Sequence, residues 1–339
     1  MAVNPPPRFP LAVLPTPLVP ADRLARAAGG AVWIKRDDLT GFALGGNKAR
    51  KLEYTVGEAL RLGADVLVTG GGPRSNHVRA TAAAAAAAGL GCEVVLYGAP
   101  PDREGANLAL VRAVGARVRF TGDPDRASVD RELEHLAREL EGAGARPYVL
   151  PRGGATPAGA YGYALAAREL AEQLEAAAVE PAAVVVAVGS CGTLAGLAAG
   201  AWSLGLRWRL VGASVSREPA ECRHRTLELA RACAALLGGS PPSADVIEIV
   251  DARGPGYGAP SEEGRRAAEL AARTEGLFLD PTFTAKAMAV VLALLREGLG
   301  GPAVFVHTGG EVEAVAASAG EAFPVGVASD RGGGSDGGR

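Results

Sequence analysis

A single lysine, Lys48, follows a Gly-Gly-Asn turn and begins a stretch rich in Lys, Arg, Leu and Glu that predicts a helix, within GFALGGNKARKLEY. The helix dipole disfavours positive charge at the first turn of a helix. An ammonium at this position is destabilised and loses its proton more readily, as an amine nucleophile requires. We therefore expect Lys48 to be either a solvated side chain or a reactive amine held close to a ligand.

A second glycine-rich turn runs through Gly189, Ser190, Cys191, Gly192 and Thr193, after the apolar run AVVVAV. A run of small residues that predicts a helix follows it. The backbone N–H groups of such a turn, with a helix N-terminus behind them, form a cup for a phosphate. The sequence has neither a Walker A pattern nor the G-x-G-x-x-G of dinucleotide-binding proteins. The turn therefore predicts a site for one phosphate rather than for a pyrophosphate.

A third turn, GGGPRSNH, presents Ser75, Asn76 and His77 before an alanine-rich helix. Ser75 or Asn76 could simply cap that helix. Alternatively, the hydroxyl and the amide face a ligand on a scaffold with free N–H groups.

These turns follow strands of one predicted sheet system. Short apolar runs alternate with alanine-rich stretches long enough for helices, which predicts a doubly wound α/β fold with mostly parallel sheets. The strand candidates are AVWIKRD, DVLVTG, EVVLYG, RVRF, PYVLP, AVVVAVG, RLVGASV, VIEIV and AVFVHTG. Ligands of such folds bind at the carboxyl ends of strands, so the turns predict one shared crevice.

A lysine amine, a cup for one phosphate, an amide and several hydroxyls fit one cofactor, pyridoxal 5′-phosphate. Its aldehyde binds a lysine, its phosphate suits a helix N-terminus, and its phenolic oxygen accepts a hydrogen bond.

The motifs IKRDDLTG, GGNKARKLE, RSNHVR, GSCGTLAG, DPTFTAKAM and HTGG together resemble a known family. It is the pyridoxal-phosphate fold-type II family of D-cysteine desulfhydrase and 1-aminocyclopropane-1-carboxylate (ACC) deaminase, also called tryptophan synthase β-like. The resemblance implies a large cofactor domain from residues 1–52 and 160–325, a smaller inserted α/β domain from 53–159, and a homodimer. Residues 326–339 are low in complexity and predict a disordered tail.

The resemblance also implies roles for single residues. Lys48 would bind the cofactor aldehyde, Lys51 would contact the phosphate or the active site, and Asn76 would bond the phenolic oxygen. Residues 189–193 would hold the phosphate. Ser75 and Tyr257 would be catalytic, and the substrate site would comprise Ser75, Asn76, His77, Tyr257 and Phe283.

Two positions depart from the family pattern. Phe283 stands where relatives usually have tyrosine, so an acid–base group is missing there. Thr284 replaces a glutamate of ACC deaminases, so a hydroxyl of Thr284 or, preferably, Thr308 would face the pyridine nitrogen and leave it neutral. Arg74, where relatives commonly have glutamine, indicates either a substrate with an extra anionic group or a surface ion pair.

Composition excludes several other classes of function. A net charge of -2 gives no reason to expect nucleic acid or an anionic membrane as a partner. No apolar stretch is long enough for a membrane helix, and no secretion signal begins the chain. The four cysteines and four histidines lack metal-ligand spacing, so we expect no metal. Unpaired cysteines indicate the cytoplasm.

We therefore expect a lyase or deaminase that removes a β-substituent from a small amino acid, with Lys48 taking the α-proton. The alternatives are ACC deaminase-like activity or a biosynthetic β-replacement with another amino acid. A binding protein that lost catalysis through Phe283, and a phosphosugar-binding protein without the cofactor, are more distant possibilities.

Overall fold

The computed structural model describes residues 5–317, so the predicted tail 326–339 lies outside the described residues. Its strands are β1 (Leu18–Pro20), β2 (Val32–Lys35), β3 (Val66–Gly71), β4 (Gly91–Leu96), β5 (Arg117–Phe120), β6 (Pro147–Leu150), β7 (Ala183–Val188), β8 (Leu210–Ser214), β9 (Ile247–Asp251) and β10 (Ala303–Val306). Its α-helices are α1 (Asp22–Ala28), α2 (Lys48–Arg61), α3 (Asn76–Ala87), α4 (Ala106–Ala113), α5 (Ser128–Gly142), α6 (Pro157–Ala176), α7 (Gly192–Ser203), α8 (Pro219–Leu236), α9 (Glu262–Glu275), α10 (Thr284–Arg296) and α11 (Glu311–Ala316).

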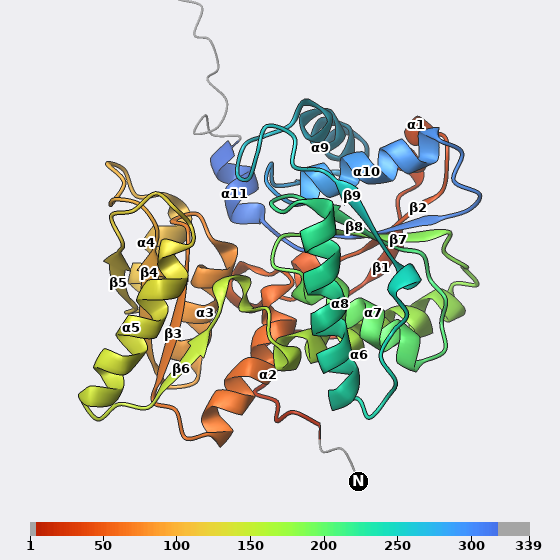
Figure 1. Cartoon of the computed structure of the whole chain (residues 1–339). Coiled ribbons are helices and arrows are strands. Elements are labelled where there is room, and N and C mark those ends of the chain that lie inside the picture. The colour runs from red at the N-terminus through yellow and green to blue at the C-terminus, as the bar shows by residue number, and fades with distance from the viewer. Residues whose placement is uncertain (1–4, 318–339) are drawn as a thin grey trace, which may run out of the picture.

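The larger sheet has six strands in the order β1-β2-β10-β7-β8-β9. All neighbours pair in parallel except β1 and β2, which are antiparallel. Helices α1, α9 and α10 pack on one face, and α6, α7 and α8 cover the other (Figure 1). Both faces of β7 and β10 are therefore buried, which explains their unbroken apolar sequences.

The smaller sheet has four parallel strands in the order β5-β4-β3-β6. Helices α2, α3 and α4 pack on one face, while α5 packs on the other with Val129, Leu133 and Leu136. The alanine-rich helix α3 lies between α2, α4 and strands β3 and β4. Its small side chains allow this close packing in a two-sided sheet.

The nine strands expected from apolar runs all form, and the doubly wound, mostly parallel fold is confirmed. Strand β1 was not expected, because three residues that end in a proline carry no clear strand pattern. The strands of the smaller sheet all lie between residues 66 and 150. Helices α2 and α6 run across the expected domain limits at 52/53 and 159/160, so those limits stay a prediction.

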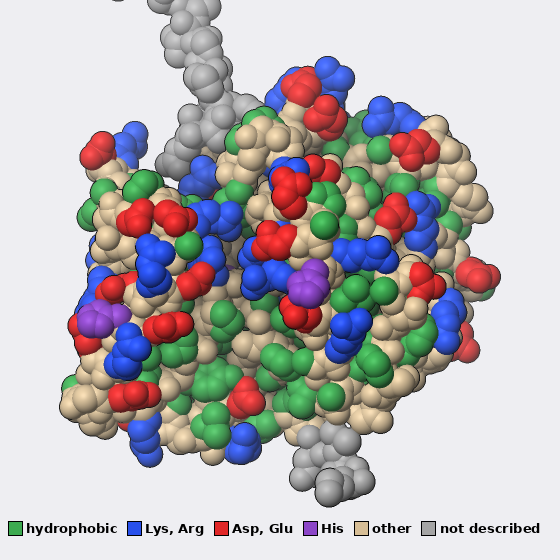
Figure 2. All heavy atoms as spheres, viewed as in Figure 1, with side chains coloured by type: hydrophobic (Ala, Val, Ile, Leu, Met, Phe, Trp, Pro, Cys, Tyr) green, Lys and Arg blue, Asp and Glu red, His purple; other side chains and the backbone are tan. Residues whose placement is uncertain are grey.

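Among residues 5–317, no helix combines the length and the apolar character that a membrane crossing demands. Acidic and basic side chains alternate over the face drawn in Figure 2, without a broad area of one charge. This distribution agrees with the small net charge of -2.

Candidate functional site

The main cleft of the described chain lies at the carboxyl ends of strands from both sheets and encloses about 1000 Å³, part of it open to solvent. Most of the residues singled out in the sequence line it. They are Lys48, Ser75, Asn76, His77, Gly189, Ser190, Cys191, Thr193, Tyr257, Phe283 and Thr308. Three others do not line it: Lys51, Gly192 and Thr284. The shared crevice expected from the strand ends is therefore present.

Backbone packing fixes the position of Lys48 at the first turn of α2. Gly45 and Gly46 have φ angles of 76° and 98°, which favour glycine. A Cβ atom on Gly45 would lie 1.9 Å from the Asp38 carbonyl oxygen, and one on Gly46 would lie 3.0 Å from that of Thr308. The Gly-Gly pair thus lets the chain pass closely against two neighbouring segments and deliver Lys48 into the cleft.

The Lys48 amine lacks a carboxylate partner among the described residues. Its Nζ donates to Asn47 Oδ1 at 2.7 Å, and Asn47 Nδ2 donates to Thr193 Oγ1 at 2.9 Å. Burial lowers the Lys48 pKa to about 8, with Asp280 opposing and Arg79 adding to the effect. At pH 7 about a tenth of this amine is therefore unprotonated and nucleophilic, far more than for an ordinary lysine.

The turn at residues 189–193 joins β7 to α7 as expected for a phosphate cup. Cys191 adopts a left-handed φ of 73°, which turns the backbone into the helix N-terminus. Lys51 Nζ and Ser190 Oγ both donate to the Gly153 carbonyl, at 2.6 and 3.1 Å. A Cβ atom on Gly192 would lie only 2.9 Å from Lys51 Nζ. Lys51 therefore supports the turn from behind, outside the cleft lining.

Burial lowers the pKa of the Lys51 amine well below its usual value, and the nearby Lys48 adds to this effect. A dianion bound at the turn would stabilise the protonated form of Lys51. The turn, its helix N-terminus and Lys51 thus fit a single phosphate group.

Ser75 and Asn76 lie where α3 begins. Ser75 Oγ accepts a hydrogen bond from the Val78 N–H at 3.3 Å, so Ser75 caps the helix and also lines the cleft. Asn76 Oδ1 accepts from Arg79 at 3.3 Å and from Asn107 at 3.2 Å. These bonds orient the amide so that its Nδ2 remains available as a donor, as a phenolic oxygen would require.

His77 is buried, and both ring nitrogens contact threonine hydroxyls: Nε2 to Thr69 at 2.9 Å and Nδ1 to Thr81 at 3.4 Å. Burial, followed by the charges of Lys51 and Lys48, lowers the His77 pKa well below 6.5. The imidazole is therefore neutral and held in place. This arrangement suits a wall of the cleft better than a proton-transfer group.

Phe283 and Tyr257 form an aromatic wall, with ring centroids 6.0 Å apart in an edge-to-face arrangement. Asp280 fixes the backbone beneath it, because its carboxylate accepts from the N–H groups of Thr282, Phe283 and Thr284. Burial raises the pKa of the Tyr257 phenol, while Arg126 opposes the shift. Tyr257 is therefore a neutral phenol that can donate a hydrogen bond.

The two threonines considered for the pyridine nitrogen lie in different places. The Thr284 hydroxyl donates to Asp280 Oδ2 at 2.7 Å and is fully buried outside the cleft lining. Thr308 lines the cleft, and its carbonyl accepts from the Asn47 N–H at 3.0 Å. Of the two hydroxyls, that of Thr308 is placed to meet a ligand.

Sequence reasoning missed several residues of the cleft. Asn47 connects Lys48 to the phosphate turn, and Tyr97 and Arg126 line the opposite part from the smaller sheet. Asn47 is adjacent to Lys48, so its position in the motif was a usable signal. Tyr97 and Arg126 follow strands β4 and β5 in segments without glycine clusters, and only the tertiary fold brings them to the cleft.

Arg74, which the sequence left open, does not line the cleft. Its Nε pairs with Glu313 at 3.0 Å, and its Nη2 donates to the Gly258 carbonyl at 3.3 Å. The ion-pair interpretation of Arg74 therefore describes its position better than a substrate contact.

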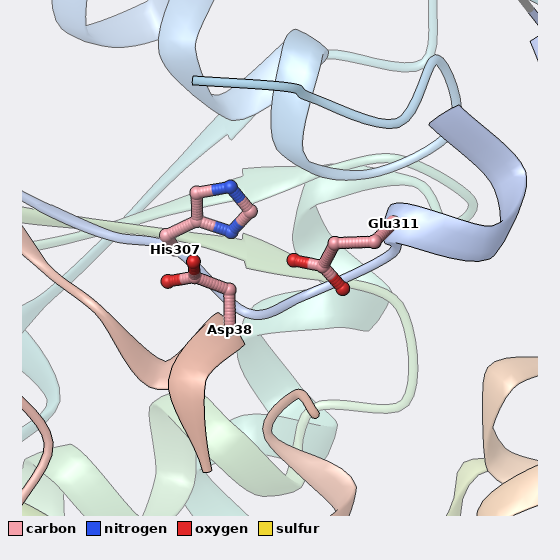
Figure 3. A group of neighbouring side chains, drawn as sticks. All are labelled: Asp38, His307 and Glu311. Carbon is pink, nitrogen blue, oxygen red and sulfur yellow. The ribbon is translucent and has the colours of Figure 1, made fainter. Parts of the chain in front are cut away.

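Asp38, His307 and Glu311 form a separate cluster near the start of α11, with possible ligand atoms within 4.8 Å of one another (Figure 3). Arg36 already pairs with Asp38 at 2.6 Å, and His307 Nδ1 accepts from the Gly309 N–H at 3.2 Å. Burial raises the Glu311 pKa to about 7. Glu311 Oε2 also accepts from the Gly310 N–H at 2.9 Å, so protein donors contact all three side chains, and the expectation of no metal stays a prediction.

The sequence and the fold both match known proteins. The family model described as pyridoxal-phosphate dependent enzyme matches residues 10–309. D-cysteine desulfhydrase of Klebsiella pneumoniae (strain 342) is 43% identical over 312 residues, covering 90% of this chain and 94% of that protein. D-cysteine desulfhydrase of Salmonella paratyphi B is 42% identical over 315 residues, with the same shares covered.

Solved structures agree. A crystal structure described as an ACC deaminase homologue superposes with a TM-score of 0.85 at 38% identity, covering 91% of this chain and 93% of that one. A crystal structure of a T.th. threonine deaminase, at 22% identity and a TM-score of 0.65 over 87% of this chain and 92% of that one, shares the fold. The family, fold and cofactor expected from the sequence are confirmed, and this chain belongs to the pyridoxal-phosphate dependent enzymes.

Proposed function

We propose that this enzyme is a lyase that eliminates a β-substituent from a small amino acid and yields a keto acid and ammonia. With a thiol substituent, as in the D-cysteine desulfhydrases it resembles, the leaving group would be sulfide. One observation carries the proposal. Lys48 presents a half-buried amine with a pKa of about 8 to a cleft lined by no Asp or Glu among the described residues.

Lys48 would hold the cofactor aldehyde, and its amine, once freed by the substrate, would accept the α-proton at Nζ. Bound pyridoxal phosphate supplies the electron sink that makes this proton acidic. Ser75 and Tyr257, both in the cleft lining, would bind the substrate carboxylate or donate a proton. Residues 189–193 would hold the phosphate, with Lys51 behind them.

Thr308 lines the cleft, and no carboxylate does among the described residues, which favours a neutral pyridine nitrogen. A neutral ring is a weaker electron sink than a protonated one. It suffices for the loss of a good β leaving group but suits the opening of a cyclopropane less well. Phe283 also argues against the opening of a cyclopropane, because its ring can neither donate nor accept a proton.

ACC deaminase-like activity is the second candidate, favoured by the TM-score of 0.85 to an ACC deaminase homologue. The two activities give different products. Elimination from cysteine or serine gives pyruvate, whereas ACC gives 2-oxobutyrate.

A turnover panel of D- and L-cysteine, D- and L-serine, and ACC tests the proposal, with keto acid, ammonia and sulfide identified as products. We expect pyruvate from at least one β-substituted amino acid and no 2-oxobutyrate from ACC. Product that retains a new β-substituent when a thiol is added would indicate β-replacement. Spectral change on amino-acid addition with no product at all would instead indicate a binding protein.

We further propose a homodimer in the cytoplasm, as the family resemblance implies. The four cysteines are free and buried, which fits a reducing compartment. Light scattering of the purified protein would test the dimer, because a monomer has half the expected mass.

A further inference from the structure

We propose that Arg126 determines substrate specificity by binding a second anionic group, such as a carboxylate, on the side chain of the amino-acid substrate. This inference rests on the proposed function, because it assigns the substrate class of the same cleft. It also moves the anionic-substrate hypothesis from Arg74, which lies outside the cleft lining, to a different arginine.

Arg126 lies between β5 and α5 and reaches the aromatic wall of the larger sheet. Its guanidinium carbon is 4.0 Å from the ring centroid of Tyr257, and both side chains line the cleft. No residue from 5 to 317 forms a hydrogen bond or an ion pair with this guanidinium. Stacking uses the flat face of the group and leaves its edge N–H donors for a planar anion.

The other arginines of the cleft lining are already neutralised. Arg152 pairs with Asp130, with Nε to Oδ1 at 2.8 Å, and Arg217 pairs with Glu221 at 2.5 Å. The described cleft lining contains no carboxylate that could neutralise Arg126. Arg126 is therefore the uncompensated guanidinium of this cleft.

The anions of the proposed reaction already have other binding groups. The cofactor phosphate would have the turn at residues 189–193, and the α-carboxylate would have Ser75 at the N-terminus of the twelve-residue helix α3. A substrate with one carboxylate would leave Arg126 without a ligand. A substrate with a second anionic group would fill that position and gain charge-assisted hydrogen bonds.

Matched ligand pairs test this assignment on the holoenzyme. Alanine and aspartate differ by one carboxylate, as do 2-aminobutyrate and glutamate, and each is used in both configurations. Dissociation constants come from the change in cofactor absorbance. We expect at least one dicarboxylate to bind more tightly than its partner. Arg126→Met should weaken that ligand about 10- to 100-fold and its partner less than threefold.

Two further variants sharpen the test. Arg126→Lys keeps the charge and should retain part of the preference. Arg131→Met removes an exposed arginine of α5 that pairs with Asp123 at 3.4 Å, and it should change neither affinity.

Equal losses for both members of a pair would mean that Arg126 binds the α-carboxylate, and this result would overturn the proposal. Absence of any preference for a dicarboxylate in the unmodified enzyme would also overturn it. Failure of the proposed function has a different signature, namely no keto acid from any amino acid of the turnover panel or from S-carboxymethylcysteine, a β-substituted amino acid that carries a second carboxylate.

Discussion

Helix α2 carries cations into two contrasting environments within four residues. Arg50 enters a buried network in which its guanidinium donates to Asp37 at 2.9 and 3.0 Å and to Glu169 at 2.8 and 2.9 Å. Lys35 joins Glu169 from β2, and the Tyr163 hydroxyl donates to Asp37 at 2.6 Å. On the cleft side, Lys48 and Lys51 have only amide and carbonyl oxygens as acceptors.

The electrostatic consequences are opposite. Burial opposes ionisation in the Arg50 network, yet hydrogen bonds from Arg50 and Lys35 lower the Glu169 pKa to about 2. Glu169 therefore stays ionised in this network. In the cleft, burial lowers the Lys48 pKa to about 8, because the charge of Asp280 offsets only part of the desolvation of the ammonium group. One helix thus separates a network that stabilises the fold from amines whose charge is left uncompensated for chemistry.

The largest expected effect is the loss of activity when Lys48 is replaced, without a loss of stability. Lys48→Met should lower turnover by at least about 10³-fold, since it removes the amine that holds the cofactor and moves the proton. The free energy of unfolding of the Lys48→Met apoprotein should not fall, because the substitution breaks no ion pair and removes a desolvated amine. Product assays measure the turnover, and urea unfolding of the apoprotein measures the stability. A large loss of stability would contradict the comparison.

Arg50→Met should show the converse behaviour. It leaves the buried Asp37 and the half-buried Glu169 without their shared guanidinium, so the free energy of unfolding should fall by about 3–5 kcal/mol. Urea unfolding at neutral pH measures this change. A loss below about 1 kcal/mol would mean that the network contributes little. Arg131→Met, at the exposed surface, is the control and should change stability by less than about 0.5 kcal/mol.

Acid should weaken the Arg50 network specifically. The Glu169 pKa is about 2 in the folded protein and about 4.3 in an unfolded chain. Its contribution to stability is therefore complete above about pH 4.3 and is lost as the pH falls toward 2, amounting to about 2–3 kcal/mol. Comparing urea unfolding of the unmodified protein and Glu169→Gln from pH 6 to pH 3 measures the first part of this loss, about 1.5–2 kcal/mol. If the two proteins lost stability by the same amount as the pH falls, this role for Glu169 would be refuted.

The smallest effect concerns the rate at which apoprotein captures the cofactor. The unprotonated fraction of Lys48 sets this rate, and its pKa is about 8. The rate should rise about tenfold per pH unit below this value and level off above it. Stopped-flow absorbance after mixing with pyridoxal phosphate follows the reaction. A midpoint near 10.5, the ordinary value for lysine, would show that the cleft does not perturb Lys48.

Much of this molecule could be predicted from the sequence, because its signals are local. Unbroken apolar runs such as 183–188 predict buried parallel strands, and glycine turns at strand ends predict a crevice. Lys48, Asn76 and the turn at 189–193 carry their meaning in short motifs. Strand β1 lacks such a signal because it has three residues and ends in a proline. The domain limits lack one because continuous helices run across them.

The remaining features depend on contacts between distant segments. Asn47 reaches the phosphate turn through Thr193, 146 residues further along the chain, whose hydroxyl accepts from the Asn47 amide at 2.9 Å. Arg126 reaches Tyr257 only because the segments that follow β5 and β9 meet at the cleft, across more than a hundred residues of sequence. Spacing along the chain contains no record of either contact.

The lysines of this chain allow a direct test of the central assignment. The sequence contains four of them: Lys35, Lys48, Lys51 and Lys286. Hydride reduction of the holoenzyme makes the link between cofactor and lysine permanent, and mass spectrometry of the digested protein locates it. We predict the pyridoxyl group on Lys48 in close to one copy per chain. Its presence on Lys51, Lys35 or Lys286 instead, or its absence from cofactor-saturated enzyme, would contradict this account.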